Sequence, residues 1–360
     1  MLNEVNMMNV EQQATARLKE MLGKVPLVQS VKPCMQGINC GGHTLDLVFQ
    51  VNVAGCEHLL VCEVKDRAQP QQVRAALLML REALRRDGRD MTPVFMAPYL
   101  SPQARALCVE HDVGYLDLAG NGRIAFDGIF IEREVADKPK AVRREAKSLF
   151  KPKSARVLRV LLRQPHRTWR VADLAGAAQV SLGHVSNVRR KLIAEEWGED
   201  SGSGLFLLKP DALLDAWRNA YEPPAGERRE YYTTLHGEAF DAAVRGAFGV
   251  TPEQGRILLA SYSAGRWMAP YLRSGTQYFY ADASGLALLV SFLNLVHTGK
   301  GGNVVVTVPT DEGVLQDAMQ PALGVACTSL VQTYLDLCTL GERGAEAADI
   351  LRREKLAWSN

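Results

Sequence analysis

The sequence predicts a multidomain α/β protein. Its 360 residues are enough for two or three domains, and 47% hydrophobic with 23% charged residues is ordinary for a globular chain. Both the first third and the last third of the chain alternate between strand-like and helix-like patterns. Between them lies a helical stretch, Ser154 to Lys209, and a strongly basic run lies just before it and in its first part. These observations predict two α/β regions that flank a small helical domain.

Three helices are expected in the central stretch because apolar residues recur there at helical spacing. The first two stripes are Val157, Leu158, Leu161 and Leu162, then Val171, Leu174, Ala175 and Ala178. A turn follows at residues 179–181, and Ser181 is suited to cap the third helix. Trp197 and the apolar run Leu205 to Leu208 enclose the segment GEDSGSG, which indicates a two-stranded wing. Together these elements predict a winged helix-turn-helix, a small DNA-binding module.

The third predicted helix has the side chains that a helix needs in a DNA major groove. Val185, Val188 and Leu192 share its inner face, and the opposite face carries Ser186, Asn187 and Arg190. The flanks of the helix carry His184, Arg189 and Lys191. Asn pairs bidentately with adenine and Arg with guanine, whereas Ser and Lys hold phosphates. We therefore expect DNA contacts from these residues and from Ser181.

The charge distribution favours DNA over the alternative of an ordinary three-helix bundle. Residues 138–170 contain twelve Lys or Arg and one acid, Glu145, a local charge of +11 in a chain of net charge +2. Such a run is typical of phosphate binding. The phosphate contacts predicted within it are Lys151, Lys153, Arg167 and Arg170. The acids Glu199 and Asp200 at the wing tip oppose this interpretation, because they would repel phosphates.

The first third of the chain predicts helix, β-hairpin, helix, strand, helix, strand. In order, the ranges are a helix at 4–23, strands at 44–53 and 58–65, a helix at 71–86, a strand at 93–97, a helix opened by Ser101-Pro102, and a β segment at 113–132. The two strands of the hairpin are joined by Ala54-Gly55-Cys56-Glu57. The stretch GYLDLAGNGR lacks the Lys and Ser/Thr of a phosphate-binding loop, so a Gly/Asn turn between strands is expected.

Asp46, followed by Glu63-Val64-Lys65 on the next strand, resembles the motif of the PD-(D/E)XK restriction-endonuclease-like fold. Alternation along a strand places Glu63 and Lys65 on one face and Val64 on the other. The resemblance implies that Asp46 and Glu63 hold Mg²⁺ and that Lys65 helps activate water. Accessory contacts are expected from Glu20 and from Gln71 or Gln72. The alternative is a domain without chemistry, because E-x-K occurs by chance in many strands and this fold is widely reused.

The last third predicts a mixed α/β domain beyond a Pro/Gly-rich break at residues 219–229. Its expected elements are a helix within 251–272 around Ile257, Leu258 and Leu259, a strand at 276–281, a helix at 286–295, a strand at 303–308, and a segment at 331–340 that leads into a closing helix. The aromatic residues of this region include Tyr262, Trp267, Tyr271 and Tyr278. Aromatic residues are enriched at interfaces, although most here are expected in the core.

The last third of the chain together with the helix-turn-helix resembles the AbiEi family of antitoxins from type IV toxin–antitoxin systems, and the fragments concerned touch most of the chain. The fragments that carry the resemblance are LLASYSAGRWMAPYLR, GGNVVVTVPTDEGV and SLVQTYLDLCTLGERGAEAADIL, with APYLSPQARAL and GYLDLAGN upstream. The resemblance implies a transcriptional autoregulator whose C-terminal domain opposes a nucleotidyltransferase-like toxin. The endonuclease-like first domain and the acidic wing tip depart from that family.

The predicted domains are an endonuclease-like domain at 1–137, a winged helix-turn-helix at 138–220 and an AbiEi-like domain at 221–360. The favoured function is sequence-specific DNA binding without a cofactor, and the alternative is a Mg²⁺-dependent DNA endonuclease. The first residues resemble no signal peptide, no apolar run is long enough for a membrane span, and seven cysteines are scattered without a CxxC. A cytoplasmic protein is expected, with double-stranded DNA and a toxin as partners, no membrane, and a homo-oligomer left open.

Overall fold

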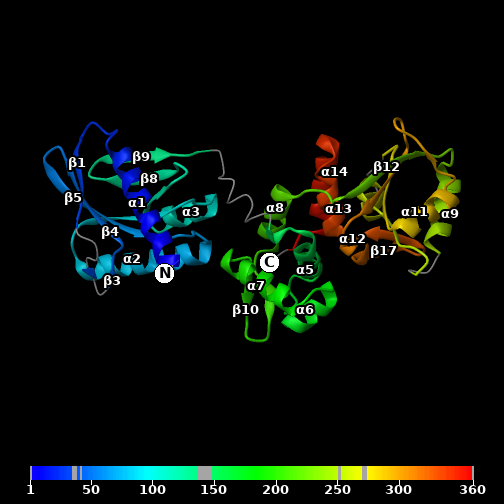
Figure 1. Ribbon diagram of the computed structural model, residues 1–360, viewed down its shortest axis with the longest axis horizontal. Helices are drawn as coiled ribbons and strands as arrows, with labels where there is room; N and C mark the ends of the chain where they lie inside the picture. The colour runs from blue at the N-terminus through cyan, green and yellow to red at the C-terminus, as the bar shows by residue number, and fades with distance from the viewer. Residues whose placement is uncertain are drawn as a thin grey trace. The chain divides into compact units, whose positions relative to one another are not determined.

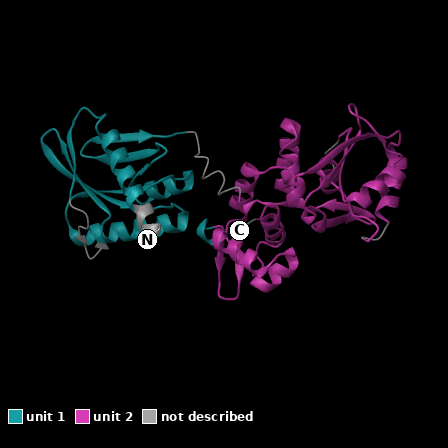
Figure 2. Cartoon of the chain, viewed as in Figure 1, with its two compact units in different colours: residues 1–145, 193–196 teal, residues 146–192, 197–360 magenta. Residues whose placement is uncertain are grey.

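The computed structural model describes residues 2–34, 39–40, 43–135, 148–249, 253–269 and 274–358. The chain is a mixed α/β protein that divides into two compact units (Figure 2). Unit 1 comprises Met1–Glu145 with Ile193–Glu196, and unit 2 comprises Ala146–Leu192 with Trp197–Asn360. Among the described residues, every helix is too short or too polar to pass through a lipid bilayer.

Unit 1 is built on a seven-stranded mixed sheet with the order β1-β4-β5-β6-β7-β8-β9. Its strands are β1 (Val28–Pro33), β4 (Leu47–Val53), β5 (Cys56–Val64), β6 (Met91–Ala97), β7 (Gly114–Asp117), β8 (Gly122–Phe126) and β9 (Ile129–Arg133), with a separate small hairpin of β2 (Asn39–Cys40) and β3 (His43–Thr44). β5, β6 and β7 run parallel, and the outer pairs are antiparallel. The helices are α1 (Leu2–Leu22), α2 (Pro70–Asp87) and α3 (Pro102–Glu110).

Helices cover both faces of the unit 1 sheet (Figure 1). α1 buries Ala14, Leu18 and Leu22 against one face, in a core that includes Val64 of β5. α2 and α3 form the other core, which includes Val61 of the same strand. Because side chains alternate along a strand, the odd and even residues of β5 serve two different cores. Residues 60–64 of β5 are therefore buried on both faces, and the polar residues of the strand lie near its two ends.

The predicted elements of this unit are confirmed at the level of helices and strands. The β4–β5 hairpin turns at Ala54 and Gly55, which both have positive φ, as a two-residue hairpin turn requires. The Ser101 hydroxyl accepts a hydrogen bond from the Ala104 N–H and caps α3. The sequence did not predict β1, whose segment VQSVKP mixes polar and apolar residues without clean alternation.

The first part of unit 2 contains the three predicted helices and the predicted hairpin. The elements are α5 (Pro152–Arg163), α6 (Val171–Ala178), α7 (Leu182–Ala194), β10 (Gly198–Asp200), β11 (Leu205–Leu207) and α8 (Pro210–Ala220). β10 and β11 are antiparallel, and Trp169 pairs with Leu205 of β11 through an isolated antiparallel β-bridge. Gly204 allows this approach, because a Cβ there would lie 2.4 Å from the Trp169 carbonyl oxygen.

The remainder of unit 2 is a second seven-stranded mixed sheet with the order β15-β12-β16-β14-β13-β18-β17. Its strands are β12 (Gly226–Tyr232), β13 (Ile257–Leu259), β14 (Gln277–Ala281), β15 (Val296–His297), β16 (Val304–Pro309), β17 (Ala318–Ala322) and β18 (Val325–Thr328). The helices are α9 (Gly237–Phe248), α10 (Ser261–Met268), α11 (Ala283–Phe292), α12 (Gly313–Gln316), α13 (Leu330–Leu337) and α14 (Gly341–Lys355). Figure 1 shows these elements in yellow-green to red.

One predicted element of this region is wrong. Ile257, Leu258 and Leu259 form strand β13 rather than a helix, and the helix begins only at Ser261. A short apolar run does not separate a buried strand from a buried helix by periodicity. Gly255 starts the segment with φ +156°, and a Cβ there would lie 2.6 Å from the Gly285 backbone nitrogen. This close approach requires glycine and holds the chain extended beside α11.

Candidate nucleic-acid interface and acid–lysine site

Helix α7 has one buried face and one exposed face, as its sequence predicts. Val185, Val188 and Leu192 are buried against the neighbouring helices. The Ser181 hydroxyl accepts a hydrogen bond from the His184 N–H at 3.3 Å, so Ser181 caps the helix. Gln179 has positive φ and ends α6, which produces the sharp turn between α6 and α7.

The exposed face of α7 carries Asn187 and Arg190, which are already paired. The Arg190 guanidinium donates to the Asn187 Oδ1 at 3.0 Å. The Ser186 hydroxyl instead donates back to the Leu182 carbonyl at 3.0 Å, one helical turn earlier. Both side chains of the Asn187–Arg190 pair are exposed to solvent. This pair therefore presents amide and guanidinium groups, which can form bidentate hydrogen bonds with base edges.

Other predicted contacts on α7 are engaged inside the protein. The His184 Nε2 lies 3.1 Å from the Ser154 hydroxyl of α5, and the Lys191 ammonium donates to the Ser148 hydroxyl at 2.6 Å. Arg189 forms an ion pair with Asp200 at the end of β10. The sequence suggested that the wing-tip acids repel phosphates, and the structure shows that one of them is bonded to a cation of α7.

The predicted basic run is divided between solvent and the protein interior. Its first members, in residues 138–147, lie outside the described residues. Lys151, Lys153, Arg167 and Arg170 are exposed around the ends of α5 and the start of α6. The Arg167 guanidinium lies over the Trp169 ring, 3.9 Å from its centre. These four cations surround the helices without being buried by them.

The remaining arginines of that run bond to the C-terminal part of unit 2. Arg156 donates to Asp311 at 2.8 Å, and Arg163 forms an ion pair with Asp317. Arg159 is buried, with 5% of its surface exposed, and it donates to the Gln332 side chain and the Gly313 carbonyl at 3.0 Å each. The sequence placed these charges in a DNA-binding run, and their role here is to join α5 to α12 and α13.

A buried acid lies beside this junction. Asp336 of α13 is 3% exposed and accepts hydrogen bonds from the Tyr221 hydroxyl, from Gln332 at 2.9 Å and from the Tyr280 hydroxyl at 3.2 Å. Burial raises the pKa of Asp336 to about 6, and these hydrogen bonds offset only part of the rise. Gln332 therefore bridges Asp336 to Arg159, and one polar network joins α5, β14 and α13.

In unit 1 the three predicted acid–lysine residues converge. The Lys65 ammonium lies 2.5 Å from the Glu63 carboxylate and 3.7 Å from the Asp46 carboxylate. Asp46 also accepts a hydrogen bond from the Val64 N–H at 2.8 Å, which fixes the carboxylate at the end of β5. Glu63 is 4% exposed, whereas Lys65 and Asp46 are half-buried. The two strands thus bring two carboxylates to one ammonium.

The electrostatics of this trio keep Lys65 protonated. Burial alone lowers the pKa of Lys65, but the hydrogen bond and charge of Glu63, with the charge of Asp46, outweigh burial and raise it. The sequence suggested Glu20 as an accessory acid, yet Glu20 pairs with Arg17 of α1 and with Lys24 just after the helix. Gln71 and Gln72 are exposed in the first turn of α2.

Among the described side chains of α1, Glu11 interacts electrostatically with Asp46 and Lys65. Burial raises its pKa, the charge of Asp46 raises it further, and Lys65 lowers it. The sequence signal for this residue was its position one helical turn before the buried stripe of α1. Asp46, Glu63 and Lys65 form a compact polar site with carboxylate oxygens, which suits a hard divalent cation chemically.

The GYLDLAGNGR stretch is a structural turn between β7 and β8, as expected. Asp117 is fully buried and accepts hydrogen bonds from the N–H groups of Gly120, Asn121 and Leu100, and from the Asn121 side chain. The N–H groups of Gly120 and Asn121, which a phosphate-binding turn would offer to an anion, donate to this carboxylate instead.

Comparison with known proteins finds no matching family model, no matching curated protein and no matching solved structure.

Proposed function

We propose that this chain is a sequence-specific DNA-binding protein that inserts α7 into the major groove. The observation that carries the proposal is the exposed Asn187–Arg190 pair on a helix whose opposite face is buried. The turn at Gln179, the cap at Ser181 and the β10–β11 hairpin supply the geometry of a winged helix-turn-helix around it. Phosphate contacts are assigned to Lys151, Lys153, Arg167, Arg170 and Ser181, which are exposed at the ends of the neighbouring helices.

The internal contacts of α7 narrow the set of base-reading residues. His184 and Lys191 are held by hydroxyls of unit 2, and Arg189 is held by Asp200. We therefore assign base contacts to Asn187 and Arg190, and phosphate or positioning roles to His184, Ser186, Arg189 and Lys191. An Arg or Asn that contacts a base edge contributes discrimination, whereas a phosphate contact contributes only general affinity.

The test begins with selection of a preferred duplex from a random pool by the intact protein. Asn187→Ala and Arg190→Ala should each weaken binding to that duplex by roughly 1–3 kcal/mol at fixed salt, while binding to an unrelated duplex changes little. The matched control is Arg353→Ala, which removes an exposed arginine from the last turn of α14 in the same unit. Unchanged affinity and unchanged preference in both α7 variants would refute the assignment.

Autoregulation and antitoxin activity of AbiEi type are proposed on the resemblance of the sequence fragments. The proposed partner is a nucleotidyltransferase-like toxin encoded beside this chain. Co-expression of the full chain with that neighbour should restore growth, and the Asn187→Ala variant should still do so if neutralisation and DNA binding use different surfaces. Failure of the full chain to relieve toxicity would remove the antitoxin role and leave DNA binding untouched.

The second candidate function is metal-dependent DNA cleavage, and the convergence of Asp46, Glu63 and Lys65 favours it. Asp46 and Glu63 would hold a Mg²⁺ ion, which supplies charge stabilisation at phosphate and a more acidic bound water. Their carboxylates already face one cation, the Lys65 ammonium, so the pair tolerates positive charge between them. Lys65 would orient a reacting phosphate or water from the same face.

Incubation of the protein with supercoiled plasmid and Mg²⁺ or Mn²⁺ tests this candidate. We expect no cleavage, with the first domain acting as a scaffold or as an extra clamp on DNA. Metal-dependent nicking that Asp46→Asn abolishes and Glu20→Gln preserves would establish the nuclease. Glu20 is a suitable control because it is an exposed acid of α1 whose partners are Arg17 and Lys24.

A further inference from the structure

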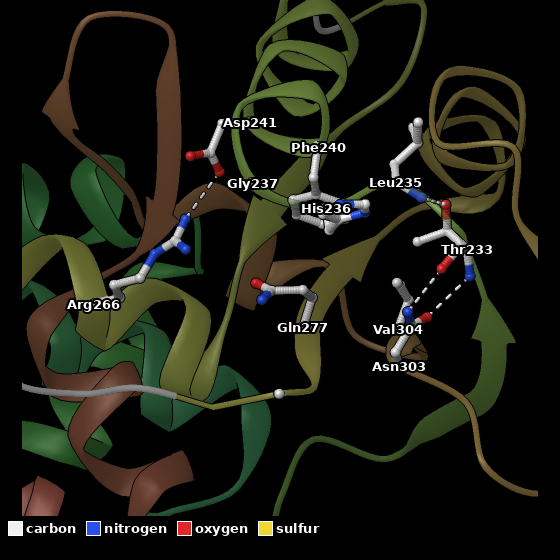
Figure 3. A pocket seen from close by; sticks show the side chains of 11 residues that line it. Thr233, Leu235, His236, Gly237, Phe240, Asp241, Arg266, Gln277, Asn303 and Val304 are labelled. Carbon is white, nitrogen blue, oxygen red and sulfur yellow. Dashed lines mark hydrogen bonds and ion pairs between the residues drawn. The ribbon is translucent and has the colours of Figure 1, made fainter.

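The C-terminal part of unit 2 contains a cavity that the proposed function does not use. Its empty space is about 480 Å³, part of which opens to solvent. The walls come from the segment after β12, the first turns of α9, and from α10, β14 and β16. Figure 3 shows the side chains around it, with Arg266 and Asp241 on one side and His236 near Phe240.

Two side chains offer hydrogen-bond donors to this cavity. Arg266 of α10 donates one guanidinium nitrogen to Asp241 at 3.1 Å, and its side chain is 39% exposed. Gln277 of β14 is oriented by Ser263, whose hydroxyl accepts from the Tyr278 N–H and donates to the Gln277 Oε1 at 2.9 Å. This arrangement fixes the carbonyl side of the amide on Ser263, so the Gln277 NH₂ group is the one left for a ligand.

Two other side chains offer acceptors. Asp241 lines the cavity and binds Arg266 through Oδ1, which leaves Oδ2 as a further acceptor. The His236 Nδ1 lies 3.0 Å from the Thr234 carbonyl, which can only accept, so Nδ1 carries the hydrogen and the Nε2 of a neutral ring is an acceptor. The Asn303 side chain accepts from the Thr233 N–H and donates to the Thr233 carbonyl, so we assign it to the wall of the cavity and not to ligand binding.

The rest of the lining is apolar. Phe240 is 6% exposed, and Leu235 and Val304 complete the apolar wall. Sites for small molecules combine apolar walls with a few polar groups that fix the orientation of the ligand. Here Arg266 and Gln277 offer donors that suit a carboxylate, and Asp241 and His236 offer acceptors that suit an ammonium group. A ligand with both charges and a short apolar branch uses every one of these features.

We propose that this cavity binds a free α-amino acid with a short apolar side chain. Arg266 and Gln277 hold the carboxylate, Asp241 and His236 hold the ammonium group, and Phe240 contacts the side chain. The cavity lies in unit 2 and shares no residue with the α7 surface, so the inference stands independently of DNA binding.

Three probes that differ by one charged group test the proposal on the full chain. L-Valine carries both charges, isovalerate lacks the ammonium group, and isobutylamine lacks the carboxylate. Saturation-transfer NMR and calorimetry should show L-valine binding at least about tenfold more tightly than either analogue, because each lost charged hydrogen bond contributes roughly 1.5–3 kcal/mol. Absence of L-valine binding, or equal binding of isovalerate, would overturn the proposal.

Two substitutions locate the binding to this cavity. Gln277→Glu keeps the oxygen that Ser263 binds and replaces the NH₂ donor with an anionic oxygen, so L-valine affinity should fall at least about tenfold. Asp241→Asn should remove the preference for L-valine over isovalerate. The matched control, Arg245→Gln, removes an exposed arginine from the far end of α9 and should change neither result. Thermal unfolding of each variant confirms that it folds, and L-valine binding that both cavity variants retain places the ligand elsewhere and refutes the site.

Discussion

Arg189 of α7 and Asp200 at the end of β10 form an ion pair that ties the hairpin to the helix assigned to DNA. Both side chains are about one-third exposed. In this pair the positive charge of Arg189 and the negative charge of Asp200 neutralise each other. The two residues lie eleven positions apart in the sequence. A phosphate that approached this edge of α7 would compete with Asp200 for the same guanidinium group.

Replacement of Asp200 by Asn should therefore strengthen binding to all DNA sequences. The substitution frees Arg189 for a phosphate, so the slope of log affinity against log salt should steepen by about one. Stability should change little, because an exposed ion pair contributes about 0–1 kcal/mol. Glu199→Gln removes the same charge from the same strand without freeing Arg189. An equal effect of both variants would show that release of Arg189 is not the cause.

Lys151 and Lys153 should act as phosphate contacts without sequence preference. Lys151→Ala and Lys153→Ala should weaken binding to specific and unrelated duplexes by the same factor and flatten the salt dependence by about one per contact. The measurement is a titration of both duplexes at several salt concentrations. A loss confined to the specific duplex would instead place one of these lysines at a base.

The stability of unit 2 should depend on the ionisation of Asp336. Its pKa is raised to about 6 from an ordinary 3.8, so the folded protein binds the proton more tightly than the unfolded chain. The free energy of unfolding should therefore fall as pH rises from about 4 to about 7. Asp336→Asn should match the parent near pH 4 and be more stable by about 1–3 kcal/mol near pH 7, given 1.36 kcal/mol per pKa unit.

Tryptophan fluorescence is a suitable probe for this experiment, because all five tryptophans lie in unit 2. Asp349→Asn is the matched control, since Asp349 is an exposed acid on α14 that pairs with Arg218. A difference between Asp336→Asn and the parent that is the same at both pH values would contradict the assignment.

Asp117 should be essential for the stability of unit 1. Asp117→Ala leaves the N–H groups of Leu100, Gly120 and Asn121 without the carboxylate that binds them. Each buried donor that loses its partner destabilises by roughly 1–3 kcal/mol, so a loss of several kcal/mol is expected. Circular dichroism should show an earlier unfolding transition that tryptophan fluorescence does not follow. A coincident shift of both signals would mean that Asp117 does not act on unit 1 alone.

Local patterns account for what the sequence predicted correctly. The stripes of α5, α6 and α7 follow helical spacing, and the alternation around Val64 is enough to place Glu63 and Lys65 on one face. These features depend only on neighbours within a few residues. The same is true of the β4–β5 hairpin, whose turn at Ala54 and Gly55 is short.

Long-range packing decided what the sequence could not show. Arg159 belongs to a run of cations that resembles a DNA footprint, yet it is buried against Gln332, which lies far along the chain. Strand β13 is as short and apolar as a turn of buried helix, and only its pairing with β14 and β18 distinguishes it. Glu11 interacts with Asp46 and Lys65 through the packing of α1, and its spacing from the buried stripe of that helix does not indicate which strands the helix covers.

The burial of Arg159 has a mechanical consequence for the helices that we propose to bind DNA. Since this side chain bonds α5 to α12 and α13, the helices around α7 are not an independent domain on a flexible linker. These helices should unfold together with the C-terminal sheet in one transition. In a chain that ends after Ala220, Arg159 should lose the partners that now bind its buried guanidinium group. A ligand or partner that displaced α13 would therefore move α5 with it, because Arg159 bonds the two helices together.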